Sequence, residues 1–322
     1  MSQMTMVQAI NHALRLELGR NERVLVLGED VGRNGGVFRA TDGLMAAFGP
    51  DRVVDMPLAE SAIVGAAVGL AMGGMCPVAE IQFLGFIYEA MDQMASQAAR
   101  VRFRSNGRFS APLVVRAPFG GGVRTPEVHS DSLEALFVHT PGLYVVMPST
   151  PYDAKGLLLT AIRTPDPVLF LEPMALYRSF RQEVPEGDYE IPLGAARVVR
   201  AGTQLTLVGW GPVVPVMEEA AERSAVSCDI IDLRWLSPID WPCVLASVEK
   251  TGRAVVVHEA VRTGGLGAEV AATIQERAFL SLEAPVMRVT GYDTPYPVPL
   301  LEDDWLPNLE RIRHAIKRTM EF

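Results

Sequence analysis

The carboxylate of Glu60 is the strongest candidate for a catalytic group in this sequence. It follows Met56-Pro-Leu-Ala59 and opens a run of small and apolar residues over 61–74. Such a run predicts a fully buried helix with closely approaching neighbours, so Glu60 would stand at the mouth of a dry interior. The helix dipole alone can explain an acidic residue at this place. The sharper hypothesis is a carboxyl group that exchanges a proton with a bound heterocycle.

A glycine-rich loop, residues 118–132, carries the second candidate, His129. Three consecutive glycines let its backbone approach a ligand closely, and loops after parallel strands are where open sheets bind ligands. Imidazole titrates near neutral pH and suits proton transfer, although a lone loop histidine is more often a surface or capping residue. The sequence also predicts a helix start here, with Ser130 or Ser132 as the cap and Glu134 completing a capping box.

Aromatic residues after another predicted strand supply the third candidate. Phe83, Phe86 and Tyr88 follow Glu80-Ile-Gln82, and core packing is the usual role of such rings. At a strand end, however, one of them could stack on a flat heterocycle.

Two further glycine motifs carry less weight. Gly209-Trp-Gly211 lacks the third glycine of a dinucleotide fingerprint, and Thr263-Gly-Gly-Leu-Gly267 could place an anion at a helix N-terminus. A plain strand-to-helix turn explains either motif equally well.

Alternating strand and helix patterns supply the elements that must position these residues. The alternation predicts a parallel sheet covered by helices on both faces. We expect strands at 23–28, 52–55, 78–81, 113–116, 143–147 and 168–171, and helices at 61–74, 86–104, 132–139 and 151–163.

A stretch rich in proline, glycine and charge, about 173–203, predicts an interdomain linker. The fold class is therefore α/β with two doubly wound domains, at 1–190 and 204–322. In the second unit we expect strands near 205–208, 229–232, 254–258 and 286–289, and helices near 213–223, 241–248, 266–278 and 307–319.

Composition narrows the class of protein. The net charge of −9 disfavours nucleic acid as a partner. Three cysteines, without Cys-x-x-Cys spacing, argue against a disulfide framework and favour a reducing, cytoplasmic compartment. The N-terminal residues lack the features of a signal peptide, and 61–74 is too short and too rich in glycine to span a membrane.

The ordered motifs together resemble the beta subunit of the thiamine-diphosphate-dependent decarboxylase component of 2-oxo acid dehydrogenase complexes. The resemblance covers essentially the whole chain. Its marks are Leu27-Gly-Glu-Asp30, Pro57-Leu-Ala-Glu60, Glu80-Ile-Gln-Phe83, Asp92-Gln93, His129-Ser-Asp-Ser-Leu-Glu134, Thr140-Pro-Gly142, Tyr152-Asp-Ala-Lys-Gly156, Ile231-Asp-Leu-Arg234 and Tyr292-Asp-Thr-Pro295.

The resemblance implies a role for each candidate. It implies an N-terminal thiamine-pyrimidine-binding domain and a C-terminal domain like that of transketolase. Glu60 would hydrogen-bond the aminopyrimidine of thiamine diphosphate and promote its reactive form, while Phe86 would stack on the pyrimidine. His129 would line the channel for the lipoyl arm and take part in reductive acylation.

The chain contains no Gly-Asp-Gly segment, which thiamine enzymes use to hold magnesium and the diphosphate. The resemblance assigns that segment to a separate alpha subunit in a heterotetramer of two alpha and two beta chains, so this chain alone should be inactive. The second domain would serve assembly and docking to the acyltransferase core. A structural potassium site would lie at Leu113, Ala161, Ile162, Thr164 and Asp166, although the family has Asp where Thr164 stands.

The substrate would be a 2-oxo acid. Thr125-Pro-Glu-Val-His129 resembles pyruvate-type bacterial members, whereas Gly291-Tyr-Asp-Thr-Pro295 also resembles branched-chain members. We favour pyruvate, with a branched-chain 2-oxo acid as the alternative. A single-chain transketolase would need its own diphosphate segment. A nucleotide-binding electron-transfer protein would also fit the doubly wound pattern, but no complete fingerprint is present.

Overall fold

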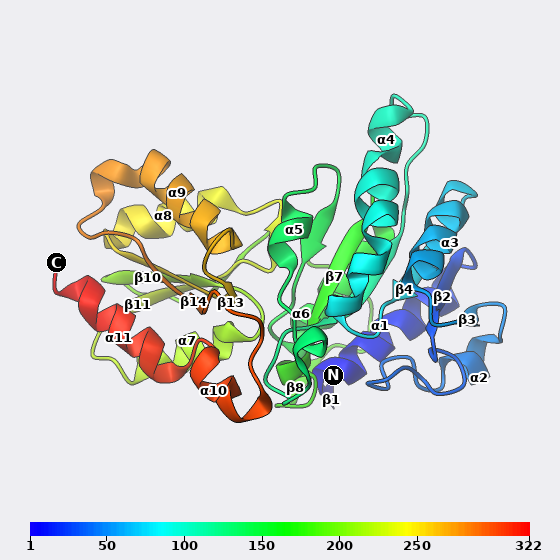
Figure 1. The fold of residues 1–322 in the computed structure, drawn as a ribbon, viewed down its shortest axis with the longest axis horizontal. Coiled ribbons are helices and arrows are strands. Elements are labelled where there is room, and N and C mark those ends of the chain that lie inside the picture. The colour runs from blue at the N-terminus through cyan, green and yellow to red at the C-terminus, as the bar shows by residue number, and fades with distance from the viewer.

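The computed structural model describes all residues from 1 to 322, and the chain forms two α/β domains that lie side by side (Figure 1). The first contains a seven-stranded sheet in the order β12-β6-β7-β5-β4-β2-β3. Its strands are parallel except for the pairing of β12 with β6. They span β2 (Val24–Glu29), β3 (Val53–Met56), β4 (Cys76–Glu80), β5 (Val114–Phe119), β6 (Tyr144–Val146), β7 (Val168–Pro173) and β12 (Trp235–Ser237).

Helices cover both faces of this sheet because its strands are apolar on both sides. Val24 and Val26 of β2 share one core cluster with α1 (Met6–Arg20) and α6 (Pro151–Arg163). Leu27 faces the opposite way and shares another cluster with α3 (Glu60–Met72). The start of α6 is set locally, since the Thr150 side chain accepts a hydrogen bond from the Asp153 amide and proline stands in the first turn.

The second domain is built on a five-stranded sheet in the order β14-β13-β10-β11-β9, in which only β9 is antiparallel to its neighbour. Its strands are β9 (Arg197–Arg200), β10 (Leu205–Gly209), β11 (Cys228–Asp232), β13 (Ala254–Val261) and β14 (Met287–Gly291). Its helices are α7 (Val213–Glu222), α8 (Trp241–Thr251), α9 (Leu266–Ala278), α10 (Glu302–Trp305) and α11 (Leu309–Met320). The two doubly wound domains expected from the sequence are confirmed.

Short elements complete the chain. β1 (Ser2–Met4) pairs with β8 (Gln182–Val184), and α2 (Leu44–Phe48) and α5 (Glu134–Val138) are single turns. Short turns occur at η4 (Glu127–His129), η5 (Met174–Leu176), η6 (Phe279–Ser281) and η7 (Pro299–Leu301). No helix in the chain has the length and apolarity needed to cross a bilayer.

Several local expectations were incomplete or wrong. Helix α1 was not predicted, although its buried residues Met6, Ile10, Ala13 and Leu14 follow helical spacing. The expected helix at 86–104 is a column of changing pitch: η1 (Leu84–Ala90), η2 (Asp92–Gln97, a π-helix), η3 (Ala98–Arg100) and α4 (Val101–Arg104). Strand β12 follows β11 in the chain but joins the sheet of the first domain, so one segment crosses the expected boundary.

The expectation that 61–74 is fully buried was also wrong. One side of α3 packs on β4 and η1, whereas Ala62, Gly69 and Met72 are exposed on the other. Apolar composition on all sides cannot tell whether the covering surface belongs to the same chain or to a partner.

Candidate active site

Glu60 is the first residue of α3, at the end of the loop that follows β3. It is only 9% exposed, and its carboxylate takes part in none of the chain's internal hydrogen bonds or ion pairs. Buried carboxylates normally have partners, whereas the helix N-terminus offers only its dipole. Glu60 is therefore free to bond to a ligand that approaches from outside the chain.

Phe86 and His129 lie together although the sequence separates them widely. The His129 ring stands edge-on to Phe86 and to Phe83, with centroids 5.0 and 4.6 Å away. This approach needs glycine at position 85, because a Cβ there would lie 1.8 Å from the Val128 carbonyl oxygen. The Nδ1 atom of His129 is buried and has no hydrogen-bond partner in the chain. Tyr88, the third aromatic considered, is 53% exposed.

Glu60 opens α3, the helix that packs against η1, and η1 carries Phe86. A second carboxylate is close to it. Desolvation raises the pKa of Glu29, at the end of β2, and the charges of Asp30 and Glu60 raise it further. A ligand with hydrogen-bond donors would relieve this crowding of negative charge.

The loop that carries His129 is held by the second domain. A carboxylate oxygen of Glu259 accepts hydrogen bonds from the Gly121 amide, at 2.6 Å, and from the Ser132 hydroxyl, at 3.0 Å. Glu302 accepts further bonds from the Arg124 amide, at 3.0 Å, and from the Tyr296 hydroxyl, at 2.8 Å. The first domain thus contributes the imidazole, and the second domain fixes the backbone beneath it.

Burial raises the pKa of Glu259 to about 7, and the nearby charge of Glu302 contributes. A carboxyl group whose pKa is raised on folding adds stability below its unfolded value, and that contribution is lost as the pH rises through the folded value. The free energy of unfolding of the wild-type chain should therefore fall between about pH 5 and about pH 8. In Glu259→Gln this fall should be smaller by at least about 1 kcal/mol. Urea unfolding at both pH values measures it. A fall as large as that of the wild type and of the exposed control Glu22→Gln would contradict the prediction.

A buried ion network joins the strands β4, β5 and β7, next to the aromatic cluster of Phe38, Phe83, Phe86 and His129. Arg116 of β5 bonds to Glu80 of β4 at 2.7 Å and to both carboxylate oxygens of Glu172 of β7 at 2.6 and 3.0 Å. The Tyr177 hydroxyl donates to the same Glu172 at 2.6 Å. Burial alone would lower the pKa of Arg116, but the two carboxylates outweigh it and raise it.

This network was missed at the sequence level. Its signal was a charged residue, Arg116, within the otherwise apolar strand β5, together with Glu80 directly opposite it on β4 and Glu172 two positions further along β7. Glu259 was missed for the same reason, since it stands with His258 in the mostly apolar strand β13.

The predicted cap of the helix after His129 was wrong. Helix α5 begins at Glu134 with Leu133 as its N-cap and no side-chain cap bond. The hydroxyl of Ser130 lies 2.6 Å from that of Thr125, and Ser132 bonds to Glu259. Glu134 accepts a hydrogen bond from the Trp210 indole at 3.3 Å, and burial raises its pKa to about 7. Contacts between domains override the local capping pattern.

The discounted glycine motifs stand at strand-to-helix turns. Trp210 stacks on the buried His258 ring, with centroids 5.1 Å apart. A Cβ at Gly265 or Gly267 would lie 2.7 or 2.4 Å from that imidazole. Close packing on His258 therefore explains why glycine is needed there.

The residues expected to hold potassium lie away from the active-site cluster, near the ends of α6 and β5. The carbonyl oxygens of Leu113 and Ala161 each accept one backbone N–H and keep a second lone pair. The Asp166 carboxylate pairs with Arg102 at 2.6 Å, and the Thr164 hydroxyl donates to the Thr160 carbonyl at 2.8 Å. The set of Leu113, Ala161, Ile162, Thr164 and Asp166 stays a prediction.

Comparison with known proteins identifies the two domains. The transketolase pyrimidine-binding domain matches residues 2–179, and the transketolase C-terminal domain matches residues 194–312. A solved structure described as a split-gene transketolase, an inactive beta4 tetramer, superposes with a TM-score of 0.80 at 24% identity, over 99% of both chains. Fold and domains together define a transketolase-type chain.

Curated relatives are much more similar. The chain is 56% identical to the pyruvate dehydrogenase E1 component subunit beta of Bacillus subtilis, 58% to that of Staphylococcus epidermidis and 55% to that of Staphylococcus aureus, over 100% of both chains in each case. The chain belongs to the family of pyruvate dehydrogenase E1 component beta subunits. A nucleotide-binding electron-transfer protein is therefore set aside.

Proposed function

We propose that this chain holds the pyrimidine half of thiamine diphosphate in a 2-oxo acid dehydrogenase that acts on pyruvate. The observation that carries the proposal is the carboxylate of the largely buried Glu60, which opens α3 and has no partner within the chain. A protonated ring nitrogen of the cofactor is the kind of partner it needs. The Phe86 ring would supply a flat apolar wall, and the unpartnered Nδ1 of His129 is available to an incoming group.

Glu60, Phe86 and His129 would each have a different role in the reaction. When bound, thiamine diphosphate supplies a carbon nucleophile that adds to the carbonyl group of the substrate. Glu60 would hold a proton at the pyrimidine and return it, which is the role of a general acid and base at a fixed site. Phe86 would orient the ring by stacking. His129 would act at the lipoyl group during acyl transfer.

A partner subunit would complete the site. The exposed side of α3, with Ala62, Gly69 and Met72, is apolar, and Leu58 just before the helix is 71% exposed. An apolar surface beside a half-built cofactor site fits an interface. We infer that an alpha subunit packs here, holds magnesium and the diphosphate, and forms a heterotetramer of two alpha and two beta chains. This chain alone would then be inactive.

Docking to the dihydrolipoyl acyltransferase core would use the second domain. Glu283 pairs with Arg253 yet remains 61% exposed at its side chain, and Glu321 lies 3.9 Å from Lys317 near the C-terminal carboxylate of Phe322. These acidic groups are available to a basic docking module. The proposed compartment is the cytoplasm, where three free cysteines would stay reduced.

Decarboxylation assays test the proposal. Pyruvate and a branched-chain 2-oxo acid are compared with thiamine diphosphate and magnesium, using this chain alone and then with its co-expressed alpha subunit. We expect activity only with the partner, and a preference for pyruvate, as the names of the relatives suggest. Activity of the chain alone would contradict the split site, and a preference for the branched-chain acid would correct the substrate.

His129→Ala should separate the two half-reactions. Acyl transfer to a lipoyl domain is expected to fall about tenfold more than decarboxylation with an artificial acceptor, a difference of about 1.4 kcal/mol in transition-state stabilisation. Both rates are measured on the same assembled complex, with His139→Ala, at the exposed C-cap of α5, as the matched control. Equal losses in the two assays would refute a specific role of His129 in transfer.

A further inference from the structure

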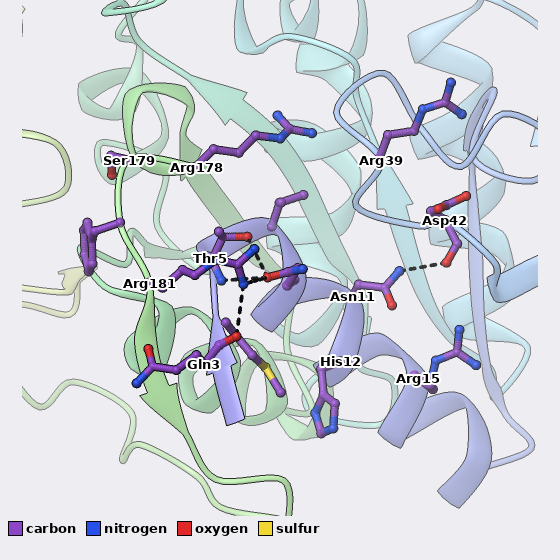
Figure 2. A pocket seen from close by; sticks show the side chains of 14 residues that line it. Gln3, Thr5, Asn11, His12, Arg15, Arg39, Asp42, Arg178, Ser179 and Arg181 are labelled. Carbon is purple, nitrogen blue, oxygen red and sulfur yellow. Dashed lines mark hydrogen bonds between the residues drawn. The ribbon is translucent and has the colours of Figure 1, made fainter. Parts of the chain in front are cut away.

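A pocket of about 810 Å³ opens at the N-terminal end of α1, on the face of the first sheet opposite to α3. Three segments line it: residues 3–15, residues 39–42 after β2, and residues 178–181 after β7. Its volume lies in the range of small-molecule sites. Figure 2 shows Arg178 and Arg181 on one side and Arg39 and Arg15 on the other, with Thr5 and Asn11 between them.

Positive charge is concentrated in this pocket. Four arginines line it, Arg15, Arg39, Arg178 and Arg181, against a single carboxylate, that of Asp42. None of the four forms an ion pair with a carboxylate of the chain, although the chain as a whole carries a net charge of −9. The same end of α1 adds the positive pole of a 15-residue helix.

Hydrogen bonds anchor three of the four arginines without neutralising them. Arg178 donates to the Phe38 carbonyl at 2.8 Å. Arg181 donates to the Gln3 carbonyl at 3.1 Å and to the Gln8 side chain at 2.9 Å. Arg39 donates to the Asn34 carbonyl. All of these acceptors are neutral, and each guanidinium has five N–H donors, so most donors and the full charge remain available.

We propose that this pocket binds a small anion carrying one or two phosphate groups. Planar guanidinium groups match phosphate oxygens in pairs, and several arginines from different segments suit a multiply charged ligand better than a single carboxylate. The site is separate from the predicted cofactor site, because α1 and α3 cover opposite faces of the sheet. The binding proposal therefore does not depend on the function proposed for Glu60.

A series of aromatic contacts connects the pocket to Phe83 and His129. Arg178 and Arg39 directly follow Tyr177 and Phe38, whose rings lie 5.0 Å apart. Phe38 contacts Phe83 at 5.5 Å, and Phe83 contacts His129 at 4.6 Å. An anion that bridges the two arginines would join the loop after β2 to the segment after β7. Backbone amides in both segments should then exchange more slowly.

Calorimetric titration of the assembled complex tests the proposal. The complex is first saturated with thiamine diphosphate and magnesium, so that the cofactor site is filled. Inorganic phosphate and pyrophosphate are then titrated separately at constant ionic strength. We expect one site per beta chain, and slower hydrogen exchange in residues 30–42 and 174–181. The double substitution Arg39→Gln with Arg178→Gln should weaken binding about tenfold to a hundredfold.

Arg200→Gln is the control, because Arg200 is exposed, lies in the second domain and undergoes the same Arg-to-Gln exchange away from the pocket. It should leave the affinity unchanged. Absence of binding to the wild-type complex would overturn the proposal. That result is expected if an acidic segment of the alpha subunit fills the pocket. Equal binding by the double variant and the control would overturn it too, because the anion would then lie elsewhere.

Discussion

Glu60→Gln should lower the turnover of the assembled complex by about 10²–10⁴-fold, the usual contribution of a positioned proton-transfer group. Glutamine keeps the shape of the side chain and can still hydrogen-bond, but it cannot take up and release a proton. The position lies at the start of α3 and makes no internal bond that the substitution would break. Folding and assembly should therefore be unchanged, which separates a chemical effect from a structural one.

The measurement is steady-state oxidation of pyruvate by the complex reconstituted with its alpha subunit. Sedimentation checks assembly, and unfolding midpoints check stability. Glu22→Gln, an exposed carboxylate after α1, undergoes the same chemical change away from the site and should behave as wild type. Turnover within a few fold of wild type would remove Glu60 from its proposed role. A loss matched by loss of assembly would mean that the residue holds the interface instead.

The site residues differ in how far the sequence could predict them. Glu60, Phe86 and His129 follow strand ends and glycine-rich segments, which are local patterns. Their mutual arrangement was not local: it depends on η1 packing against the backbone of Val128 with no side chain at Gly85. The sequence could name the participants, but it could not show that Phe83 and Phe86 both contact the imidazole.

Residues supplied by another element were the ones missed. Glu259 fixes the His129 loop from a strand far along the chain, and nothing near Gly121 in the sequence points to it. The same limit applies to α3, whose apolar composition predicted complete burial while one face remains exposed. Helix α1 differs, because its apolar spacing was present and was simply not assigned.

Arg116→Met should lower the free energy of unfolding by about 3–5 kcal/mol, because it leaves two buried carboxylates without their counterion. Arg116, Glu80 and Glu172 are all buried and join three adjacent strands. Burial already raises the pKa of Glu80, and the nearby charge of Glu172 raises it further, while Arg116 opposes this. Removing the arginine removes the opposing charge.

The pH dependence has a definite direction. Without Arg116 the Glu80 carboxyl group would bind its proton more tightly in the folded chain than in the unfolded chain. Its stabilising contribution would then be present at low pH and lost as the pH rises. The difference between variant and wild type should accordingly be largest near pH 8 and shrink toward pH 5. Urea unfolding at the two pH values measures it.

Neutralising the carboxylates as well provides the decisive comparison. A triple variant that adds Glu80→Gln and Glu172→Gln to Arg116→Met has a similar volume but no buried charge, so it should recover part of the lost stability. If it is no more stable than Arg116→Met alone, packing rather than charge explains the loss. Recovery would instead show that the arginine is needed because two carboxylates are present. Tyr177, which donates to Glu172 and contacts Phe38, would then owe its position beside the aromatic cluster to this balance of charge.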